Sequence, residues 1–170
     1  MKKILFMVSS MNIGGVEKSL LSLLSEIPKD KYDITLLLLE KKGGFLEQIP
    51  NWVKVEEASW FKEIKPIIMQ PPKQTIKNYI RTNKYFKVLS FIGCYIIDKC
   101  FDNRYLYYKN VFKSIPFNEN EYDVAIAYQG PTDIIDYYIT HKVRANKKIS
   151  WVHFDISKHY INKKLYSKLY

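Results

Sequence analysis

Three short segments of this sequence place glycines or polar side chains directly after an apolar run. They are Ser10–Gly15, Gln129–Asp133 and His153–Ser157. If the three apolar runs are strands of one parallel sheet, their carboxyl ends meet at one edge, where open α/β sheets bind ligands. The sequence therefore predicts a single site assembled from three loops.

The first segment contains the pair Gly14 and Gly15, immediately before a run with helical periodicity. A helix N-terminus favours an anion through its free N–H groups and its dipole. Glycine also lets the backbone approach a phosphate closely, because no Cβ intervenes. The pair matches neither the G-x-G-x-x-G fingerprint nor a Walker loop. A plain tight turn explains the two glycines equally well, so both interpretations stay open.

The third segment begins with WVHFD, which puts His153 and Asp155 two residues apart at the end of an apolar run. Residues i and i+2 point to the same side of a strand, so both side chains are expected to face one cleft. A histidine there can donate a hydrogen bond or meet developing charge, since its protonation is tunable near neutral pH. The alternative is a structural histidine that caps the next helix or bonds a neighbouring loop.

The second segment, YQGPTD, contains the turn formers Gly130 and Pro131. Gln129 and Thr132 carry groups that can hydrogen-bond a hydroxylated ligand. Thr132 or Asp133 is expected to cap the following helix, with Asp133 preferred for that role. The sequence has no D-x-D, no H-E-x-x-H and no cluster of Cys and His, so we expect no dedicated metal site.

The elements that must position these segments alternate between strand and helix. The expected strands are Lys3–Ser9, Ile34–Leu39, Val53–Glu57, Tyr122–Tyr128 and Lys147–Phe154, and the expected helices are Val16–Ile27, Phe45–Ile49, Asp133–Ile139 and Ile156–Tyr170. The longer strands are apolar without alternation, as in a parallel sheet buried on both faces. This order predicts an α/β, Rossmann-like parallel sheet with right-handed crossovers and flanking helices.

The middle of the chain, Trp60 to Phe117, differs in composition from the rest. It contains 11 Lys and Arg against 3 Asp and Glu, which is +8 of the net charge of +10, and 13 of the 26 aromatic residues. We expect a basic, aromatic helical insertion here. Its two or three helices are expected at Thr75–Arg81, Lys84–Cys100 and Leu106–Ser114, with a loop at Gln70–Lys73.

This basic composition suits an anionic membrane surface, where rings and lysine stems are buried while the charges meet headgroups. The segment NYIRTNKYFKVLSFIGCYIIDK can lie on a bilayer in this way. The alternative is a set of helices packed on the sheet with a solvated basic face. The longest uncharged run, Val88–Ile97, is far shorter than the roughly 20 residues that span a bilayer, so no transmembrane helix is predicted.

Other partners and the redox environment follow from absences in the sequence. Cys94 and Cys100 form neither a disulfide framework nor a metal-binding pattern, which favours two buried thiols in a reducing cytoplasm. No recognised nucleic-acid-binding motif occurs, so we expect no nucleic-acid partner.

The segments NIGGVEKSLLSLL, YDVAIAYQGPTD and KKISWVHFD, in this order and spacing, resemble the N-terminal half of a family-4 glycosyltransferase with the GT-B fold. The resemblance implies two Rossmann-like domains, of which the first mainly binds the acceptor and the second holds the nucleotide-sugar donor. It also implies transfer with retained anomeric configuration and without a metal or other cofactor. The residues it implies at the site are His153 for catalysis, near the transferred sugar, and Gly14, Gly15, Lys18, Gln129, Gly130, Thr132 and Asp155 for substrate binding. Gln129 departs from the acidic residue expected in relatives.

On this resemblance, residues 1–170 are expected to form the acceptor-side domain, with the nucleotide-sugar-binding domain absent from this chain. We expect the chain to fold but not to turn over by itself. The expected role of the whole protein is hexosyl transfer to a polysaccharide or glycolipid precursor of the cell surface. Its expected location is the cytoplasm or the inner face of the plasma membrane. Two alternatives stay open: a non-enzymatic module that binds anionic membrane through its basic helices, and another GT-B-like enzyme such as an epimerase or a phosphorylase.

Overall fold

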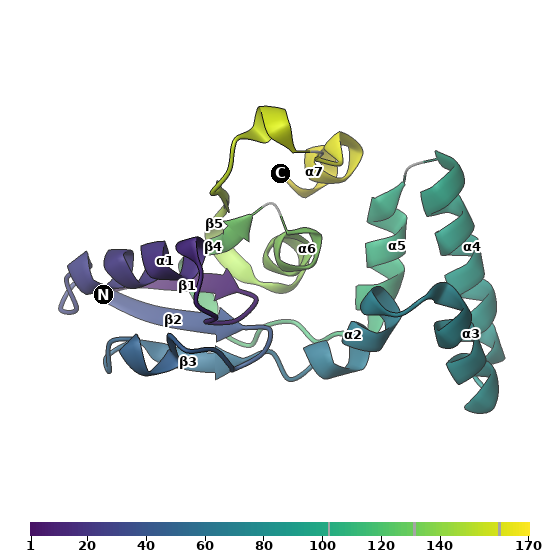
Figure 1. Ribbon diagram of the computed structural model, residues 1–170, viewed down its shortest axis with the longest axis horizontal. Helices are drawn as coiled ribbons and strands as arrows, with labels where there is room; N and C mark the ends of the chain where they lie inside the picture. Colours follow the sequence, from purple (N-terminus) through teal and green to yellow (C-terminus); the bar gives the residue numbers. More distant parts are fainter. Residues whose placement is uncertain (102, 131, 160) are drawn as a thin grey trace. The chain divides into compact units, whose positions relative to one another are not determined.

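A computed structural model describes the chain except Asp102, Pro131 and Tyr160 (Figure 1). The chain divides into two compact units. The sheet unit consists of Met1–Ser59 and Phe117–Tyr160, and the helical unit consists of Trp60–Pro116 and Ile161–Tyr170.

The sheet unit is built on five parallel strands in the order β3-β2-β1-β4-β5. The strands are β1 (Lys2–Val8), β2 (Tyr32–Leu38), β3 (Lys54–Glu57), β4 (Glu121–Gly130) and β5 (Arg144–Val152). In the central strand, Phe6 pairs with Leu36 on one side and with Ile126 on the other. The predicted Rossmann-like parallel α/β sheet is therefore confirmed.

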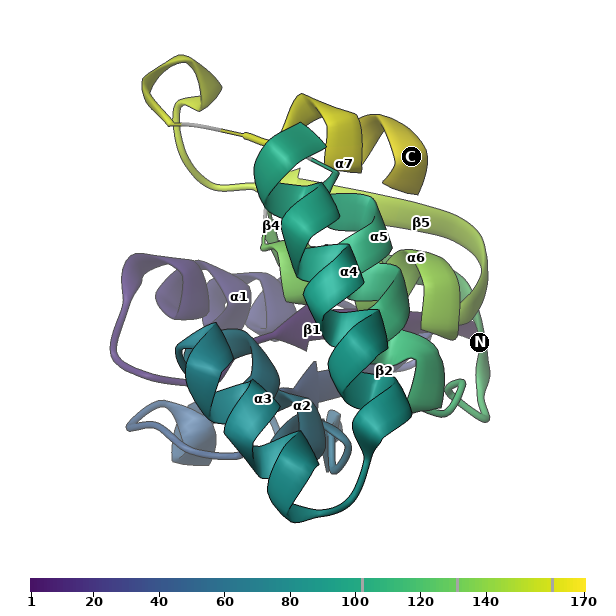
Figure 2. The same ribbon diagram turned by 90° about the vertical axis from the view of Figure 1, so that its right-hand side faces the viewer.

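Helices cover both faces of this sheet, because its central strands are apolar on both sides. Helix α1 (Gly15–Glu26) packs Leu20 and Leu24 into a cluster with Phe6 and Leu36. The neighbouring residues along β1 alternate to the opposite face, where helix α6 (Asp133–Lys142) lies; α1 and α6 stand on either side of β1 in Figure 2. A short 3₁₀ turn, η1 (Leu46–Gln48), occupies the place of the helix expected at Phe45–Ile49.

Strand β5 differs from its prediction as a buried strand over Lys147–Phe154. It ends at Val152 and pairs with β4 alone, at the edge of the sheet. Its residues alternate between exposed and half-buried, and Ile149 and Trp151 keep 41% and 42% of their surface exposed. The apolar residue types of this segment predict burial, but an edge position leaves such side chains partly in water.

Between Trp60 and Pro116, the described residues form four α-helices rather than two or three. They are α2 (Phe61–Met69), α3 (Pro72–Arg81), α4 (Tyr85–Phe101) and α5 (Arg104–Val111), followed by the 3₁₀ turn η2 (Phe112–Ser114). Helix α2 escaped prediction because Pro66 lies inside it, and an internal proline argues against a helix. The loop expected at Gln70–Lys73 is shorter than predicted, since Pro72 occupies the first turn of α3, a position that proline favours.

The C-terminal segment was expected to be one helix over Ile156–Tyr170, but it is divided. A 3₁₀ turn, η3 (Ile156–Lys158), belongs to the sheet unit, and helix α7 (Lys163–Leu169) belongs to the helical unit. Asn162 starts α7, because its Oδ1 accepts a hydrogen bond of 2.8 Å from the backbone N–H of Leu165. Tyr160, within the expected helix, lies outside the described residues.

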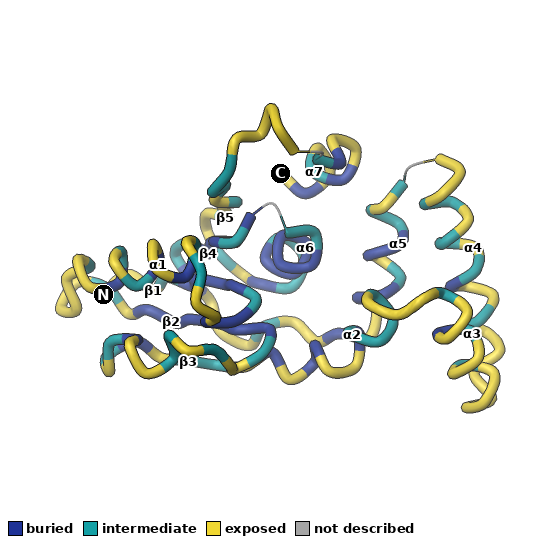
Figure 3. Tube along the Cα trace, in the orientation of Figure 1, coloured by how far each residue is buried: buried dark blue, intermediate teal, exposed yellow. Residues whose placement is uncertain are grey.

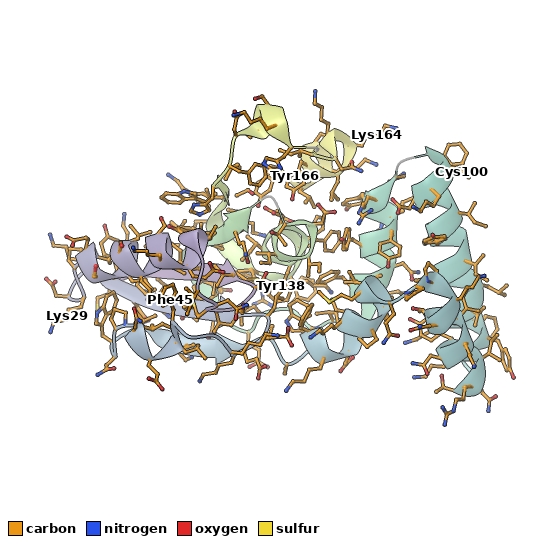
Figure 4. All side chains as sticks on the ribbon, viewed as in Figure 1. Lys29, Phe45, Cys100, Tyr138, Lys164 and Tyr166 are labelled. Atoms are coloured by element: carbon orange, nitrogen blue, oxygen red, sulfur yellow. The ribbon has the colours of Figure 1, made fainter. Side chains whose placement is uncertain are left out.

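Burial differs strongly between individual helices (Figure 3). Helix α6 is buried over most of its length, whereas Phe91 is the one described residue of α4 that is buried. Cys94 is half-buried in α4, and burial raises the pKa of its thiol. Cys100, near the C-terminal end of the same helix, is exposed (Figure 4), so the expected burial of both cysteines is wrong for this one. No described helix has the length and apolar character needed to cross a membrane.

Candidate functional site

The three predicted loops follow three neighbouring strands of the sheet. Strands β1, β4 and β5 end at Val8, Gly130 and Val152, and all three run in the same direction. Gly130 is paired in register with Val152, and Met7 is paired with Ala127. The loops that carry the candidate residues therefore leave the sheet at one edge, as the sequence predicts.

The glycine pair lies at the start of α1. Gly14 precedes the helix in an extended conformation, and Gly15 is its first residue. A Cβ added to Gly15 would meet no atom within 4 Å, so the space beside this residue is open. A Cβ added to Gly14 would instead collide with the carboxylate of Glu17, which is only 7% exposed. Lys18 is exposed in the same turn.

The buried carboxylate of Glu17 changes how the helix N-terminus can be used. It brings negative charge to the first turn of α1, where the helix dipole favours it. A phosphate that approached Gly14 would meet this carboxylate, whereas the side of Gly15 has no such obstacle. Sequence reasoning missed Glu17, although an acidic residue in the first turn of an expected helix is a recognised signal of a helix start.

A second loop supports the loop between β1 and α1. The backbone N–H of Met11 donates to the carbonyl of Lys42 at 2.9 Å, and the N–H of Phe45 donates to the carbonyl of Met11 at 2.9 Å. Gly43 between them has a φ of +122°, and a Cβ there would overlap the backbone of Met11 and Asn12. Only glycine fits this conformation and this contact, so Gly43 fixes the position of the candidate loop.

Gln129 and Thr132 hold the backbone of the site. The side-chain Oε1 of Gln129 accepts a hydrogen bond of 2.8 Å from the N–H of Ser9, which ties the end of β4 to the end of β1. The hydroxyl of Thr132 donates to the carbonyl of Gln129. Both side chains thus have structural partners at the edge where a ligand is expected.

The start of α6 differs from the predicted cap. Thr132, not Asp133, occupies the N-cap position, and Asp133 is the first helical residue. The carboxylate of Asp136, fully buried, accepts a hydrogen bond of 2.8 Å from the N–H of Thr132. A carboxylate inside the helix therefore satisfies the backbone N–H of the N-cap residue itself, and among the described residues no side-chain cap bond is formed at this helix start. Pro131, predicted in the same turn, lies outside the described residues.

Gly130 is required by close packing. A Cβ on this residue would collide with the hydroxyl of Ser150 and lie 3.2 Å from the carbonyl oxygens of Ala127 and Trp151. The Oγ of Ser150 is itself buried without a hydrogen-bond partner. Sequence reasoning missed Ser150, whose signal is a small polar residue between the apolar Ile149 and Trp151.

His153 lies just beyond β5, with its ring packed on aromatic neighbours. Its ring centroid is 4.5 Å from that of Tyr128 and 6.2 Å from that of Trp151. The hydroxyl of Tyr128 lies 3.0 Å from the Oγ of Ser19 on α1, so His153, Tyr128 and Ser19 contact one another in series. The contacts place the imidazole on the face of the sheet that α1 covers.

The Nε2 atom of His153 is buried and has no hydrogen-bond partner. A buried polar atom without a partner costs about 1–3 kcal/mol of stability. A ligand that offered this nitrogen a hydrogen bond would recover that loss. The predicted importance of His153 thus coincides with an unsatisfied group at the predicted edge.

Asp155 has a different environment from His153. Strand β5 ends at Val152, so the alternation of side chains along a strand does not extend to residues 153 and 155. The exposed Asp155 caps η3, accepting hydrogen bonds from the backbone N–H of Ser157 at 3.0 Å and from its hydroxyl at 2.7 Å. Both bonds lower the pKa of the Asp155 carboxyl, and the bond from the Ser157 hydroxyl is the larger cause.

The described residues contain no group of three His, Cys, Asp or Glu side chains placed to hold a metal ion. No family model matches the chain, and neither a curated protein nor a solved structure matches it.

Proposed function

We propose that the sheet unit is the acceptor-side half of a retaining glycosyltransferase that uses a nucleotide-sugar donor. The acceptor is a glycan or a lipid-linked precursor of a cell-surface polysaccharide or glycolipid. The proposal rests on the resemblance of three segments to family-4 glycosyltransferases and on their common position at one edge of a parallel sheet. The donor-binding half belongs to a second domain outside these residues.

The observation that carries the proposal is the unsatisfied Nε2 of His153. A sugar offers several hydroxyl groups, each able to donate or accept a hydrogen bond, and an imidazole nitrogen can do either according to its tautomer. The ring of His153 is held by Tyr128 and Trp151, so its nitrogen is oriented before a ligand binds. Such preorganisation is what an interaction with a transition state requires.

In the proposed reaction, the acceptor hydroxyl oxygen bonds to the anomeric carbon of the donor sugar. The bond between that carbon and the phosphate oxygen of the nucleotide breaks, and the hydroxyl proton passes to the departing phosphate. As positive charge builds on the ring of the transferred sugar, His153 contributes a hydrogen bond to one of the hydroxyl groups of that sugar. The open side of Gly15 and the charge of Lys18 suit the approach of the donor phosphates.

The test is NMR of the 170-residue chain labelled with ¹⁵N at its three histidines. The ligands are uridine and guanosine diphosphate hexoses and short oligosaccharides. We expect at least one of them to shift the imidazole resonances of His153 and to leave those of the exposed His159 unchanged. His153→Ala is expected to weaken that binding about tenfold or more, since a lost hydrogen bond that leaves a buried partner unpaired costs about 1–3 kcal/mol. His159→Ala is the matched control.

Two outcomes would contradict the proposal. The first is a His153 resonance that no sugar or sugar nucleotide moves. The second is clear sugar transfer by the 170-residue chain alone, which would remove the need for a second domain. The Gly15→Val variant tests the loop before α1. It should prevent the ligand-induced shift of the His153 resonances while changing the free energy of unfolding by less than about 1 kcal/mol.

A second candidate function is a membrane-binding module without transfer activity. The observation in its favour is the exposed apolar face of α4.

A further inference from the structure

Helix α4 carries an apolar stripe on its exposed side. Tyr85, Leu89, Gly93, Ile96 and Cys100 recur at spacings of three and four residues and therefore share one face. Tyr85, Leu89 and Ile96 keep 58%, 70% and 50% of their surface exposed. Phe86 and Phe101, beside this stripe, are 90% and 68% exposed. We call these seven residues the α4 stripe.

The opposite face of α4 is the one that packs inside the helical unit. Phe91 contacts the rings of Tyr79 on α3, Tyr95 on α4 and Tyr107 on α5, with centroids 6.1–6.2 Å apart. Helices α4 and α5 run side by side (Figures 1 and 2). The α4 stripe is therefore surplus to the packing of its own unit. Contiguous exposed apolar surface of this kind marks an interaction site.

A cavity of about 790 Å³ adjoins this region of α4. Ile64, Ile67, Phe91 and Val111 give it apolar walls, and Lys84, Lys87 and Lys113 add positive charge. Among the described residues that line it, Glu63 is the one acidic side chain, and Phe86 belongs both to the cavity and to the α4 stripe. Lys84, Lys87 and Phe91 lie on the side of α4 opposite the stripe, so the cavity and the stripe lie on different sides of one helix.

The charge of the helical unit indicates what covers the stripe. This unit contains 14 Lys and Arg against 3 Asp and Glu, whereas the sheet unit contains 13 against 14. A second copy of this unit would bring two strongly positive surfaces together, which Coulomb repulsion disfavours. An anionic lipid surface offers both an apolar layer for the stripe and negative charge for the lysines.

We propose that the helical unit binds the surface of an anionic lipid bilayer through the α4 stripe. The helix lies parallel to the membrane with the stripe among the upper acyl chains, while Lys84 and Lys87, on the opposite side of the helix, add positive charge within about a Debye length of the headgroups. No described helix can cross a bilayer, so this attachment is peripheral. The inference does not depend on the sugar-transfer proposal, because lipid binding is measured without any sugar.

The test is co-sedimentation of the 170-residue chain with vesicles of phosphatidylcholine, alone or mixed with phosphatidylglycerol. We expect clear preference for the anionic vesicles, and loss of that preference at high salt. Leu89→Ser with Ile96→Ser should lower binding to anionic vesicles about tenfold or more, because two apolar side chains no longer leave water. Lys84→Gln with Lys87→Gln should lower it roughly 30-fold, at about 1 kcal/mol for each charge.

Matched variants in the sheet unit control for these changes. Ile156→Ser replaces an apolar side chain that is 57% exposed, and Lys29→Gln with Lys31→Gln removes the same charge as the α4 lysine pair. Lys29 lies in the loop after α1 (Figure 4). Both controls should bind vesicles within about twofold of the unmodified chain, since neither position is on the proposed surface.

Equal binding to neutral and anionic vesicles, or undiminished binding by the Leu89 and Ile96 variant, would overturn the proposal. Light scattering gives a further decisive result. If the chain is a dimer that Leu89→Ser with Ile96→Ser makes monomeric, and it binds no vesicles, the stripe is a contact between copies and the lipid proposal is wrong. Circular dichroism of each variant shows that the helices have formed.

Discussion

The two units of this chain differ in where their apolar side chains gather: in the interior of the sheet unit, and also along an exposed face of α4 in the helical unit. In the sheet unit, Leu36 and Phe6 are almost completely buried between strands and helix α1, and the unsatisfied groups are polar atoms such as the Nε2 of His153. In the helical unit, Leu89 and Phe86 face the solvent. The sheet unit is also close to neutral, whereas the excess of Lys and Arg lies in the helical unit.

Apolar content alone therefore does not locate a core. A buried side chain stabilises the fold, and an exposed one is available to a partner. We propose that the unsatisfied Nε2 of His153 in the sheet unit binds a hydroxylated molecule, and that the uncovered apolar face of α4 in the helical unit binds a lipid surface.

The largest expected change in stability distinguishes a leucine in the sheet interior from a leucine on the α4 stripe. Leu36→Ala, in the interior of the sheet, is expected to lower the free energy of unfolding by about 3 kcal/mol, through lost burial and the cavity left behind. Leu89→Ala on the α4 stripe should change it by less than about 0.5 kcal/mol. Urea unfolding followed by circular dichroism measures both. A large loss for Leu89→Ala would mean that the stripe belongs to a core.

Gly43 in the sheet unit and Gly93 on α4 are expected to respond differently to replacement by alanine. Gly43→Ala should destabilise the sheet unit by about 2 kcal/mol, because alanine is strained at a φ of +122° and its Cβ overlaps the backbone of Met11. Gly93→Ala on α4 should be neutral or stabilise by up to about 1 kcal/mol, since a Cβ there meets nothing within 4 Å. Thermal unfolding of the two variants, measured side by side, would refute this interpretation if their order were reversed.

Two tyrosine hydroxyls provide a smaller contrast. Tyr128→Phe removes the hydroxyl that lies 3.0 Å from Ser19 and should cost about 1 kcal/mol. Tyr85→Phe removes an exposed hydroxyl that donates to Asn83 at 3.2 Å, and should have almost no effect. A double-mutant cycle of Tyr128→Phe with Ser19→Ala isolates the energy of the pair. A coupling energy near zero would show that Tyr128 does not link α1 to the site.

The pH dependence of the helical unit gives an effect that is absent at neutral pH and develops only in alkaline solution. Burial raises the pKa of the Tyr107 hydroxyl to about 12, above its ordinary value of 10.0. Between these values the unfolded chain loses this proton more readily than the folded one, so stability falls as pH rises. The free energy of unfolding of the Tyr107→Phe variant, measured in urea, should fall less steeply over this pH range. Equal slopes for the variant and the unmodified chain would contradict a buried hydroxyl.

Much of the sheet was predictable because parallel strands buried on both faces have an unmistakable apolar composition. The strands β1, β2 and β4 each lie within two residues of their predicted limits. Strand β5 was predicted to be buried, since the residues of an edge strand can be as apolar as those of a central one. Helix α2 was missed because Pro66 outweighed its apolar periodicity.

The site was predictable as a place more than as an arrangement of side chains. The rule on strand ends brought the three loops to one edge, and His153 lies there. The roles of Gly43 and Ser150 depend on contacts between loops far apart in the sequence, which spacing alone does not contain. Asp155 shows the reverse error, because a strand that ends two residues earlier than expected changes where a side chain is directed.

The segment Trp60–Pro116 lies between β3 and β4 along the chain, and this insertion has a consequence for the order of folding. The first strand to be synthesised is the central one, and the bond between Ser9 and Gln129 joins residues 120 positions apart. At roughly 5–20 residues per second, one edge of β1 waits on the order of ten seconds for β4 to emerge from the ribosome. Through that interval the nascent chain presents an unpaired apolar edge, which is open to pairing with other chains until β4 arrives.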